Sequence, residues 1–193
     1  MSATSSSPKA RAAVAGNAER MSGVAVTKTL IRALAIVSFL APLAARPAAA
    51  ACETCQIYNF LSNQCLQPVS GSTEQGAAIV QQPCNGSLAQ EWTRVRVSGN
   101  VSHYVNSLSK LCLDARGGAA NHTPVQQWTC NRISNENWEE GDDSDDTIPP
   151  LYSRVSGTRS YCLDIPGGQK TAGLAMQIYR CNGTEAQAWW LPE

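Results

Sequence analysis

The sequence contains few of the residues on which hydrolytic enzymes depend. It has two histidines, His103 and His122. It lacks both the G-x-S-x-G motif of serine hydrolases and the H-E-x-x-H motif of zinc proteases. These absences argue against catalysis, and we expect a protein that is not an enzyme and needs no metal or cofactor.

Long apolar segments and extended amphipathic helices are also absent. The main apolar run, over residues 33–44, is too short to cross a bilayer, which needs roughly 20 residues. No amphipathic helical pattern exceeds two turns. We therefore expect no membrane insertion and a fold that is not built on helices.

Residues 1–50 have the composition of a secretory signal peptide. Basic residues precede the apolar run, and small residues follow it up to a cleavage site near Ala50 or Ala51. The leader holds six of the fifteen Lys and Arg residues but one of the fifteen acids, so the remainder carries a net charge of −5. Residues 51–193 are thus expected to form one secreted domain without the basic surface that nucleic acid requires.

A sequence unit recurs three times in this domain. Each copy begins with C-L-Q or C-L-D, at Cys65, Cys112 and Cys162, and the starts are 47 and 50 residues apart. The second cysteine of each copy lies eight residues before a tryptophan, Trp92, Trp138 or Trp189. A fixed period of this size indicates one structural unit that is stable only when packed on its neighbours. The copies cover about residues 55–98, 99–145 and 146–193.

The cysteines within each copy are 19, 18 and 19 residues apart, which in a secreted chain indicates disulfides. The predicted pairs are Cys65–Cys84, Cys112–Cys130 and Cys162–Cys181. Buried free thiols are the alternative, but the recurrence argues against them. Cys52 and Cys55 lie outside the repeat. We interpret them as a local disulfide, with a redox C-x-x-C motif and an intermolecular bond as alternatives.

Short segments of β-forming residues alternate with Gly, Asn, Ser and Pro. Examples are I-Y-N-F, T-R-V-R-V, S-H-Y-V and M-Q-I-Y, and this spacing predicts a closed all-β fold. The acidic segment over residues 139–150 does not follow a calcium-loop pattern, so we expect a solvated loop between repeats. Four N-x-S/T sequons, at Asn85, Asn100, Asn121 and Asn182, are either turn formers or glycan acceptors.

Three copies of C-L-D, Q-x-aromatic-x-C and Q-x-W in fixed order resemble the ricin B-type lectins, also called R-type lectins or family 13 carbohydrate-binding modules. The resemblance extends from Cys55 to the C-terminus. It implies a β-trefoil of three pseudo-symmetric repeats, in which the tryptophans of Q-x-W are core residues. Gln90 and Gln187 would mainly bond to backbone groups, although this glutamine can also support a sugar pocket.

The resemblance also implies a sugar site in a repeat that keeps certain residues. An acid after C-L accepts hydrogen bonds from hydroxyls, an aromatic residue two positions before the second cysteine stacks on the sugar, and an Asn precedes Q-x-W. The second copy keeps all of these in Asp114, Gln126, Trp128 and Asn135, although its Q-x-W is altered to Glu136-Asn137-Trp138. We expect the best site here, with Asp114 and Trp128 facing one exposed hollow.

The other two copies depart further from the pattern. The third has Asp164, Gln177, Tyr179 and Gln187, but Ala186 stands where Asn is expected, so we predict a weaker site. The first has Gln67, Gln82 and Ala89 in place of the acid, the aromatic residue and the Asn, so it is interpreted as structural only. In any copy the acid could instead cap a turn and the aromatic residue could belong to the core.

The resulting hypothesis is a secreted carbohydrate-binding protein for galactose- or xylan-type glycans. A protein-binding β-trefoil, such as a protease inhibitor or toxin-like effector, is the alternative, because fold does not fix function. An enzyme is the less favoured third possibility, since Asp114 and Asp164 lie in different copies and would not form a hydrolytic pair.

Overall fold

The structure is a computed structural model that describes residues 53–142 and 148–192. Regular structure in these ranges consists of β-strands and single-turn 3-10 helices. The predicted leader and Cys52 lie outside the described residues. No helix in the described part of the chain is long and apolar enough to cross a membrane.

After an initial strand β1 (Thr54–Gln56), the strands fall into three sets of four. The first set is β2 (Tyr58–Asn59), β3 (Gln64–Pro68), β4 (Ile79–Pro83) and β5 (Glu91–Ser98). The second is β6 (Val101–Asn106), β7 (Cys112–Ala115), β8 (Thr123–Trp128) and β9 (Trp138–Glu140). The third is β10 (Leu151–Ser153), β11 (Tyr161–Asp164), β12 (Gln177–Arg180) and β13 (Trp189–Trp190).

Short 3-10 helices lie at matching places in the repeats. Those before the last strand of each repeat are η2 (Leu88–Gln90), η3 (Ser134–Glu136) and η5 (Glu185–Gln187). Two others, η1 (Val69–Gly71) and η4 (Pro166–Gly168), follow β3 and β11.

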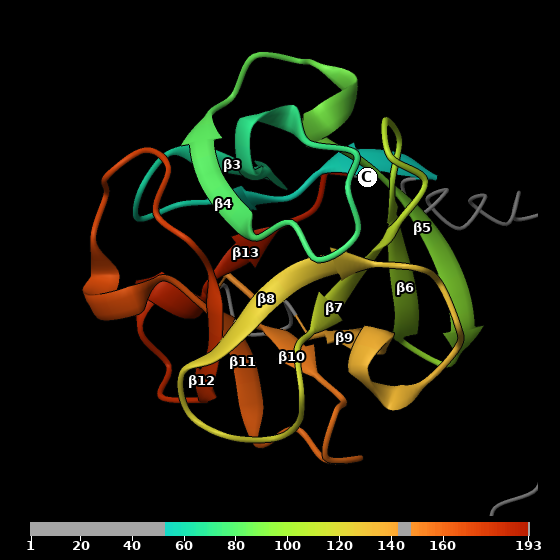
Figure 1. Ribbon diagram of the computed structural model, residues 1–193. Coiled ribbons are helices and arrows are strands. Elements are labelled where there is room, and N and C mark those ends of the chain that lie inside the picture. Colours follow the sequence, from blue (N-terminus) through green and yellow to red (C-terminus); the bar gives the residue numbers. More distant parts are fainter. Residues whose placement is uncertain (1–52, 143–147, 193) are drawn as a thin grey trace, which may run out of the picture. The chain divides into compact units, whose positions relative to one another are not determined.

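The strand pairing closes the three sets on one another. The first strand of each set pairs with the last strand of the set before it, as β6 with β5, β10 with β9 and β2 with β13. The two middle strands form an antiparallel hairpin, as in β3–β4, β7–β8 and β11–β12. Figure 1 shows the sets grouped around a common centre, with the third set in orange and red. The fold is the all-β trefoil that the resemblance implied.

The tryptophans of the repeated motif form the centre of the core, as expected. Trp92, Trp138 and Trp189 have no exposed surface. Each indole Nε1 donates a hydrogen bond to the carbonyl of the leucine in the C-L motif of its own repeat, at 3.1, 2.9 and 2.9 Å respectively. A buried indole N–H needs such an acceptor, so these bonds tie the end of each repeat to its beginning.

The three predicted disulfides are present. Cys65–Cys84, Cys112–Cys130 and Cys162–Cys181 each join the first strand of a middle hairpin to the chain just after its second strand, with Cα atoms 5.1 Å apart. Cys55 is buried in β1. Its pairing with Cys52 stays a prediction.

The acidic segment begins differently from the expected solvated loop. Glu139 and Glu140 belong to β9, and Glu139 is 7% exposed. Glu139 forms ion pairs with Arg159 and Arg154, while Glu140 lies 2.9 Å from Arg94 Nε. The hydrogen bond from Arg159, with the charges of both arginines, holds the pKa of Glu139 below its usual range. The first two acids of this segment, Glu139 and Glu140, are thus strand residues paired with arginines. The sequence alone did not distinguish them from the acids that follow.

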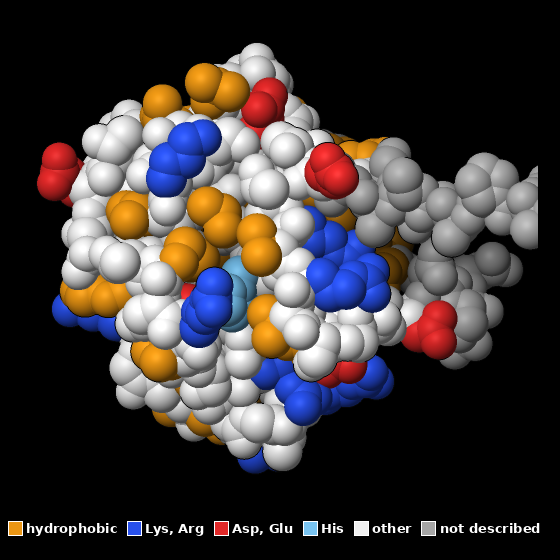
Figure 2. Space-filling view, turned by 90° about the vertical axis from the view of Figure 1, so that its right-hand side faces the viewer, with side chains coloured by type: hydrophobic (Ala, Val, Ile, Leu, Met, Phe, Trp, Pro, Cys, Tyr) orange, Lys and Arg blue, Asp and Glu red, His pale blue; other side chains and the backbone are white. Residues whose placement is uncertain are grey.

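The charged side chains do not gather on the face that Figure 2 displays. Lys and Arg side chains stand there in separate groups among hydrophobic and uncharged ones. Among the hydrophobic residues at the surface, Val95 and Val97 of β5 are 46% and 49% exposed.

Replacing Trp138 with Phe tests the role of the central hydrogen bonds. We expect the free energy of unfolding to fall by about 2–4 kcal/mol, because a cavity forms and the Leu113 carbonyl loses its buried donor. Trp128→Phe is the matched control, since Trp128 is only half-buried, and it should change stability by less than about 1 kcal/mol. Urea denaturation measures both. Equal losses in the two variants would contradict a special role for Trp138.

Candidate functional site

The loop of each middle hairpin lies against the middle hairpin of the next repeat. The backbone N–H of Gly76 donates to Gln127 O at 2.8 Å, that of His122 to Ile178 O at 3.1 Å, and that of Gly173 to Gln81 O at 2.8 Å. The three donor residues all have left-handed backbone angles, with φ of 84°, 66° and 83°. They therefore occupy equivalent places in the three repeats.

Each of these residues lies beside the position from which an aromatic side chain would contact a sugar. A Cβ on Gly76 would lie 3.5 Å from the Trp128 ring, and one on Gly173 would lie 3.6 Å from Gln82 Nε2. The ring of His122 packs edge-on against Tyr179, with centroids 5.1 Å apart. The walls of each candidate site consequently come from two repeats.

The third repeat contains a surface hollow of about 800 Å³. The predicted residues Asp164, Gln177 and Tyr179 line it, and Tyr179 is half-buried. His122 and Leu61, from the other two repeats, complete the wall. The hollow thus combines a carboxylate and a phenol ring, the two groups expected for a sugar.

Asp164 is held in place by two glutamines. Gln177 Nε2 donates to Oδ1 at 2.6 Å, and Gln187 Nε2 donates to Oδ2 at 3.0 Å. Each carboxylate oxygen can accept a second hydrogen bond, so Asp164 retains acceptor capacity toward the hollow although only 5% of the residue is exposed. Gln187 is 1% exposed and is engaged with Asp164, Arg180 O and the Asn182 N–H, so its part is to orient the carboxylate.

The environment of Asp164 shifts its ionisation. Burial raises the pKa of this carboxyl, while the bonds from Gln177 and Gln187 and the nearby His122 act in the opposite direction. The expected Asn is replaced by Ala186, which also lines the hollow and supplies no polar group.

The second repeat holds its predicted residues in a similar frame. Asp114 is 2% exposed and, among the described residues, accepts a side-chain hydrogen bond only from Gln126, at 2.8 Å. Trp128 is half-buried beside Gly76, and Asn135 in η3 is also partly exposed. Asp114 is buried to a similar extent as Asp164, so the exposed hollow expected around Asp114 and Trp128 stays a prediction.

The second repeat differs from the third in having Glu136. This glutamate occupies the place of Gln187, and its carboxylate accepts the backbone N–H groups of Asn131 and Arg132 at 2.9–3.1 Å. A carboxylate cannot donate to Asp114 as Gln187 donates to Asp164. Burial, followed by the charge of Glu136, raises the pKa of Asp114. The second repeat therefore has two acids at the positions where the third repeat has an acid and an amide.

The first repeat has an amide pair at the same place. Gln90 Nε2 donates to Gln67 Oε1 at 2.9 Å, and Gln90 Oε1 accepts the Asn85 N–H at 2.7 Å. Neither a carboxylate nor an aromatic ring stands at the equivalent of Asp164 and Tyr179.

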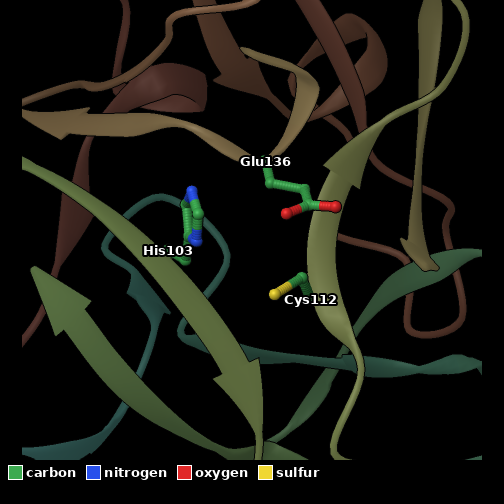
Figure 3. Close-up of side chains that lie close together, drawn as sticks. All are labelled: His103, Cys112 and Glu136. Atoms are coloured by element: carbon green, nitrogen blue, oxygen red, sulfur yellow. The ribbon is translucent and has the colours of Figure 1, made fainter. Parts of the chain in front are cut away.

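Three side chains that lie close together in the second repeat do not suit a metal ion. Figure 3 shows His103, Cys112 and Glu136, whose ligand atoms lie within 4.8 Å of one another. The sulfur of Cys112 is in the disulfide with Cys130 and so cannot act as a thiolate. Glu136 is occupied by backbone N–H groups, and His103 Nε2 is hydrogen-bonded to Asn137 at 2.7 Å.

Comparison with known proteins defines the family. The model of the ricin-type β-trefoil lectin domain matches residues 53–189. The chain belongs to this family. Its members are generally carbohydrate-binding modules without catalytic activity. A search of curated proteins finds no match to the chain.

Solved structures share the fold. The designed threefold-symmetric protein ThreeFoil is 23% identical with a TM-score of 0.68, and the match covers 74% of this chain and 99% of that one. A ricin B-like lectin of Macrolepiota procera, in complex with lactose, is 19% identical with a TM-score of 0.60, covering 75% and 97%. The exo-β-1,3-galactanase 1,3Gal43A of Clostridium thermocellum is 28% identical with a TM-score of 0.66, but the match covers 75% of this chain and 30% of the enzyme.

Three features of the candidate sites were not predicted from the sequence. His122 and Leu61 line the third-repeat hollow from other repeats. Glu136 was noted as an altered motif, but its effect on Asp114 was not inferred. For His122 a signal existed, because it stands in its repeat at the place of a glycine in the others; for Leu61 we find none.

Exchanging Glu136 for Gln tests the effect of its charge on Asp114. Folding raises the pKa of Asp114. The contribution of protonated Asp114 to stability is therefore present at low pH and is lost as pH rises through the raised pKa. Glu136→Gln supplies a donor and removes a charge, so we expect about 1 kcal/mol of added stability at pH 7 and little change near about pH 3.

The reverse exchange, Gln187→Glu, is the matched control in the third repeat. It removes the donor to Asp164 and should destabilise the protein by about 1–3 kcal/mol at pH 7. Denaturation at both pH values measures the effects. A pH-independent loss of stability in Glu136→Gln would refute the interpretation.

Proposed function

We propose that this chain is a secreted, non-catalytic lectin whose principal sugar site is the hollow of the third repeat. The observation that carries the proposal is the presence of Asp164 and Tyr179 in one hollow. The carboxylate, fixed by Gln177 and Gln187, accepts hydrogen bonds from two sugar hydroxyls. The phenol ring of Tyr179 covers the C–H face of the pyranose.

A second, weaker site is proposed in the second repeat. Asp114, Gln126, Trp128 and Asn135 supply the residue types that the family uses, but burial and, to a smaller extent, the charge of Glu136 disfavour the ionised form of Asp114. This order of strength reverses the one expected from sequence. A shallow site binds a monosaccharide with a Kd on the order of 1 mM. Two sites on one domain raise the apparent affinity for a multivalent glycan.

Galactose-type sugars are the favoured ligands, with xylan fragments as the other class. Support comes from relatives of the same fold, since one was solved in complex with lactose and an earthworm R-type lectin with GalNAc. The three disulfides and the predicted leader support an extracellular location. The absence of hydrolase motifs supports a non-catalytic role.

A protein-binding β-trefoil is the alternative, and one surface cluster favours it. Phe60 and Trp190 are 42% and 49% exposed, and they pack around Tyr58 with ring centroids 5.3–6.4 Å apart. Exposed aromatic groups of this kind are common in protein interfaces. A protein that binds through this cluster would be indifferent to changes at Asp164.

Titration with galactose, lactose and xylotriose, followed by NMR, tests the lectin function. Asp164→Asn keeps the shape of the side chain but removes its charge, and we expect affinity to fall about 10- to 100-fold, since a charged hydrogen bond contributes about 1.5–3 kcal/mol. Asp114→Asn should have a smaller effect, and Gln82→Ala in the first repeat none. If no sugar perturbs the spectrum of the wild-type protein, the proposal is wrong.

Binding should also depend on pH. Because burial raises the pKa of Asp164, the residue is protonated at a higher pH than a free aspartate. Sugar affinity should therefore decrease as pH falls through that pKa, while the fold itself persists. Affinity measured by calorimetry between about pH 3 and pH 7 checks this. Unchanged affinity across the range would mean that the Asp164 carboxylate is not the acceptor.

A further inference from the structure

The backbone conformation at His122 does not explain why a histidine occupies this position. Residues Gly76 and Gly173 occupy the same place in the other repeats, and all three have a positive φ. A Cβ raises the energy of this conformation, although His tolerates it better than most residues. The backbone geometry alone would favour glycine, so the reason for an imidazole lies in its contacts.

The hydrogen bonds of His122 define which ring nitrogen carries the proton. Nδ1 lies 3.0 Å from Gln177 Oε1. The amide of Gln177 is oriented by Asp164, because Nε2 donates to the carboxylate at 2.6 Å, and this leaves Oε1 as an acceptor. His122 Nδ1 is therefore the donor, and in the neutral ring Nε2 is an acceptor.

The remaining nitrogen of His122 is available to a ligand. Within residues 53–142 and 148–192, His122 Nε2 makes no side-chain hydrogen bond, and the residue is exposed and lines the hollow beside Asp164 and Tyr179. The ring meets Tyr179 edge-on at an interplanar angle of 65°, so the two rings form adjoining walls of the hollow.

We propose that His122, contributed by the second repeat, is a ligand-contacting residue of the third-repeat site. Its Nε2 accepts a hydrogen bond from a hydroxyl of a neutral pyranose that is stacked on Tyr179 and bonded to Asp164. This polar contact replaces the one that an Asn at position 186 would make, because Ala186 has no polar side chain. The inference rests on the proposed lectin function and assigns its principal site to two repeats.

The second repeat provides the natural comparison for this role. Gln126 donates to Asp114 as Gln177 donates to Asp164, but the residue at the place of His122 is Gly76. No side chain there can bond to Gln126 or reach a sugar. The contribution of His122 is thus one of the differences between the two candidate sites.

His122→Gly separates a ligand contact from a structural role. The glycine relieves the left-handed backbone but loses the hydrogen bond to Gln177, and because these effects oppose each other we expect the melting temperature to change by less than about 3 °C. Lactose or xylotriose affinity should fall about tenfold because one hydrogen bond is lost. His122→Asn, which tolerates a positive φ and keeps a polar group, should fall between glycine and wild type.

NMR of the two histidines gives a direct readout with an internal control. On addition of either sugar, the imidazole signals of His122 should shift, while those of His103, which is 7% exposed and bonded to Asn137, should not. Shifts near Tyr179 without any at His122, together with unchanged affinity in His122→Gly, would overturn this inference and leave the lectin function standing.

Two other results also count against the inference. A parallel loss of stability and affinity in His122→Gly would show that the histidine serves the fold. No binding of either sugar to the wild-type protein would refute the lectin function and this inference with it.

Discussion

A buried hydrogen bond from a tryptophan indole to a leucine carbonyl, made once in each repeat, fixes the geometry on which the candidate sites depend. The leucine precedes the residue that points toward the site, as Leu163 precedes Asp164. Successive side chains of a strand point to opposite faces, so fixing the leucine in the core directs its neighbour outward. Core packing and site geometry are thereby linked through one backbone position.

The three repeats use this shared frame differently. Gln67 and Gln90 form a pair of two amides, and Asp164 and Gln187 form a pair of a carboxylate and an amide. The second repeat has the acids Asp114 and Glu136 at these positions, and the charge of Glu136 adds to the effect of burial on the pKa of Asp114. Each arrangement fits the same backbone, and its energetic consequence is only a few kcal/mol. Symmetry of the fold therefore does not impose symmetry of binding, because ionisation and donor supply are decided by single side chains.

The repeats also depend on one another for the walls of their sites. The loop of one middle hairpin lies on the next, so Trp128 meets Gly76 and Tyr179 meets His122. A repeat taken alone would lack both a closed core and a complete site. This agrees with the general behaviour of repeat units, which bury their apolar faces only against neighbours.

The threefold repeat and the disulfide pairs could be predicted from the sequence, because cysteine and tryptophan recur at fixed intervals, and the repeated motifs resembled those of the family in which the tryptophans are core residues. The resemblance also named Asp164, Gln177 and Tyr179 as members of one site, and in the structure they lie on paired strands of one hairpin. The sequence did not predict the effect of Glu136 on Asp114, the pairing of Glu139 with two arginines, or the contact of His122 with Tyr179, which became visible in the folded chain. Those contacts join different elements, and burial and charge proximity arise from how the elements pack rather than from any local pattern.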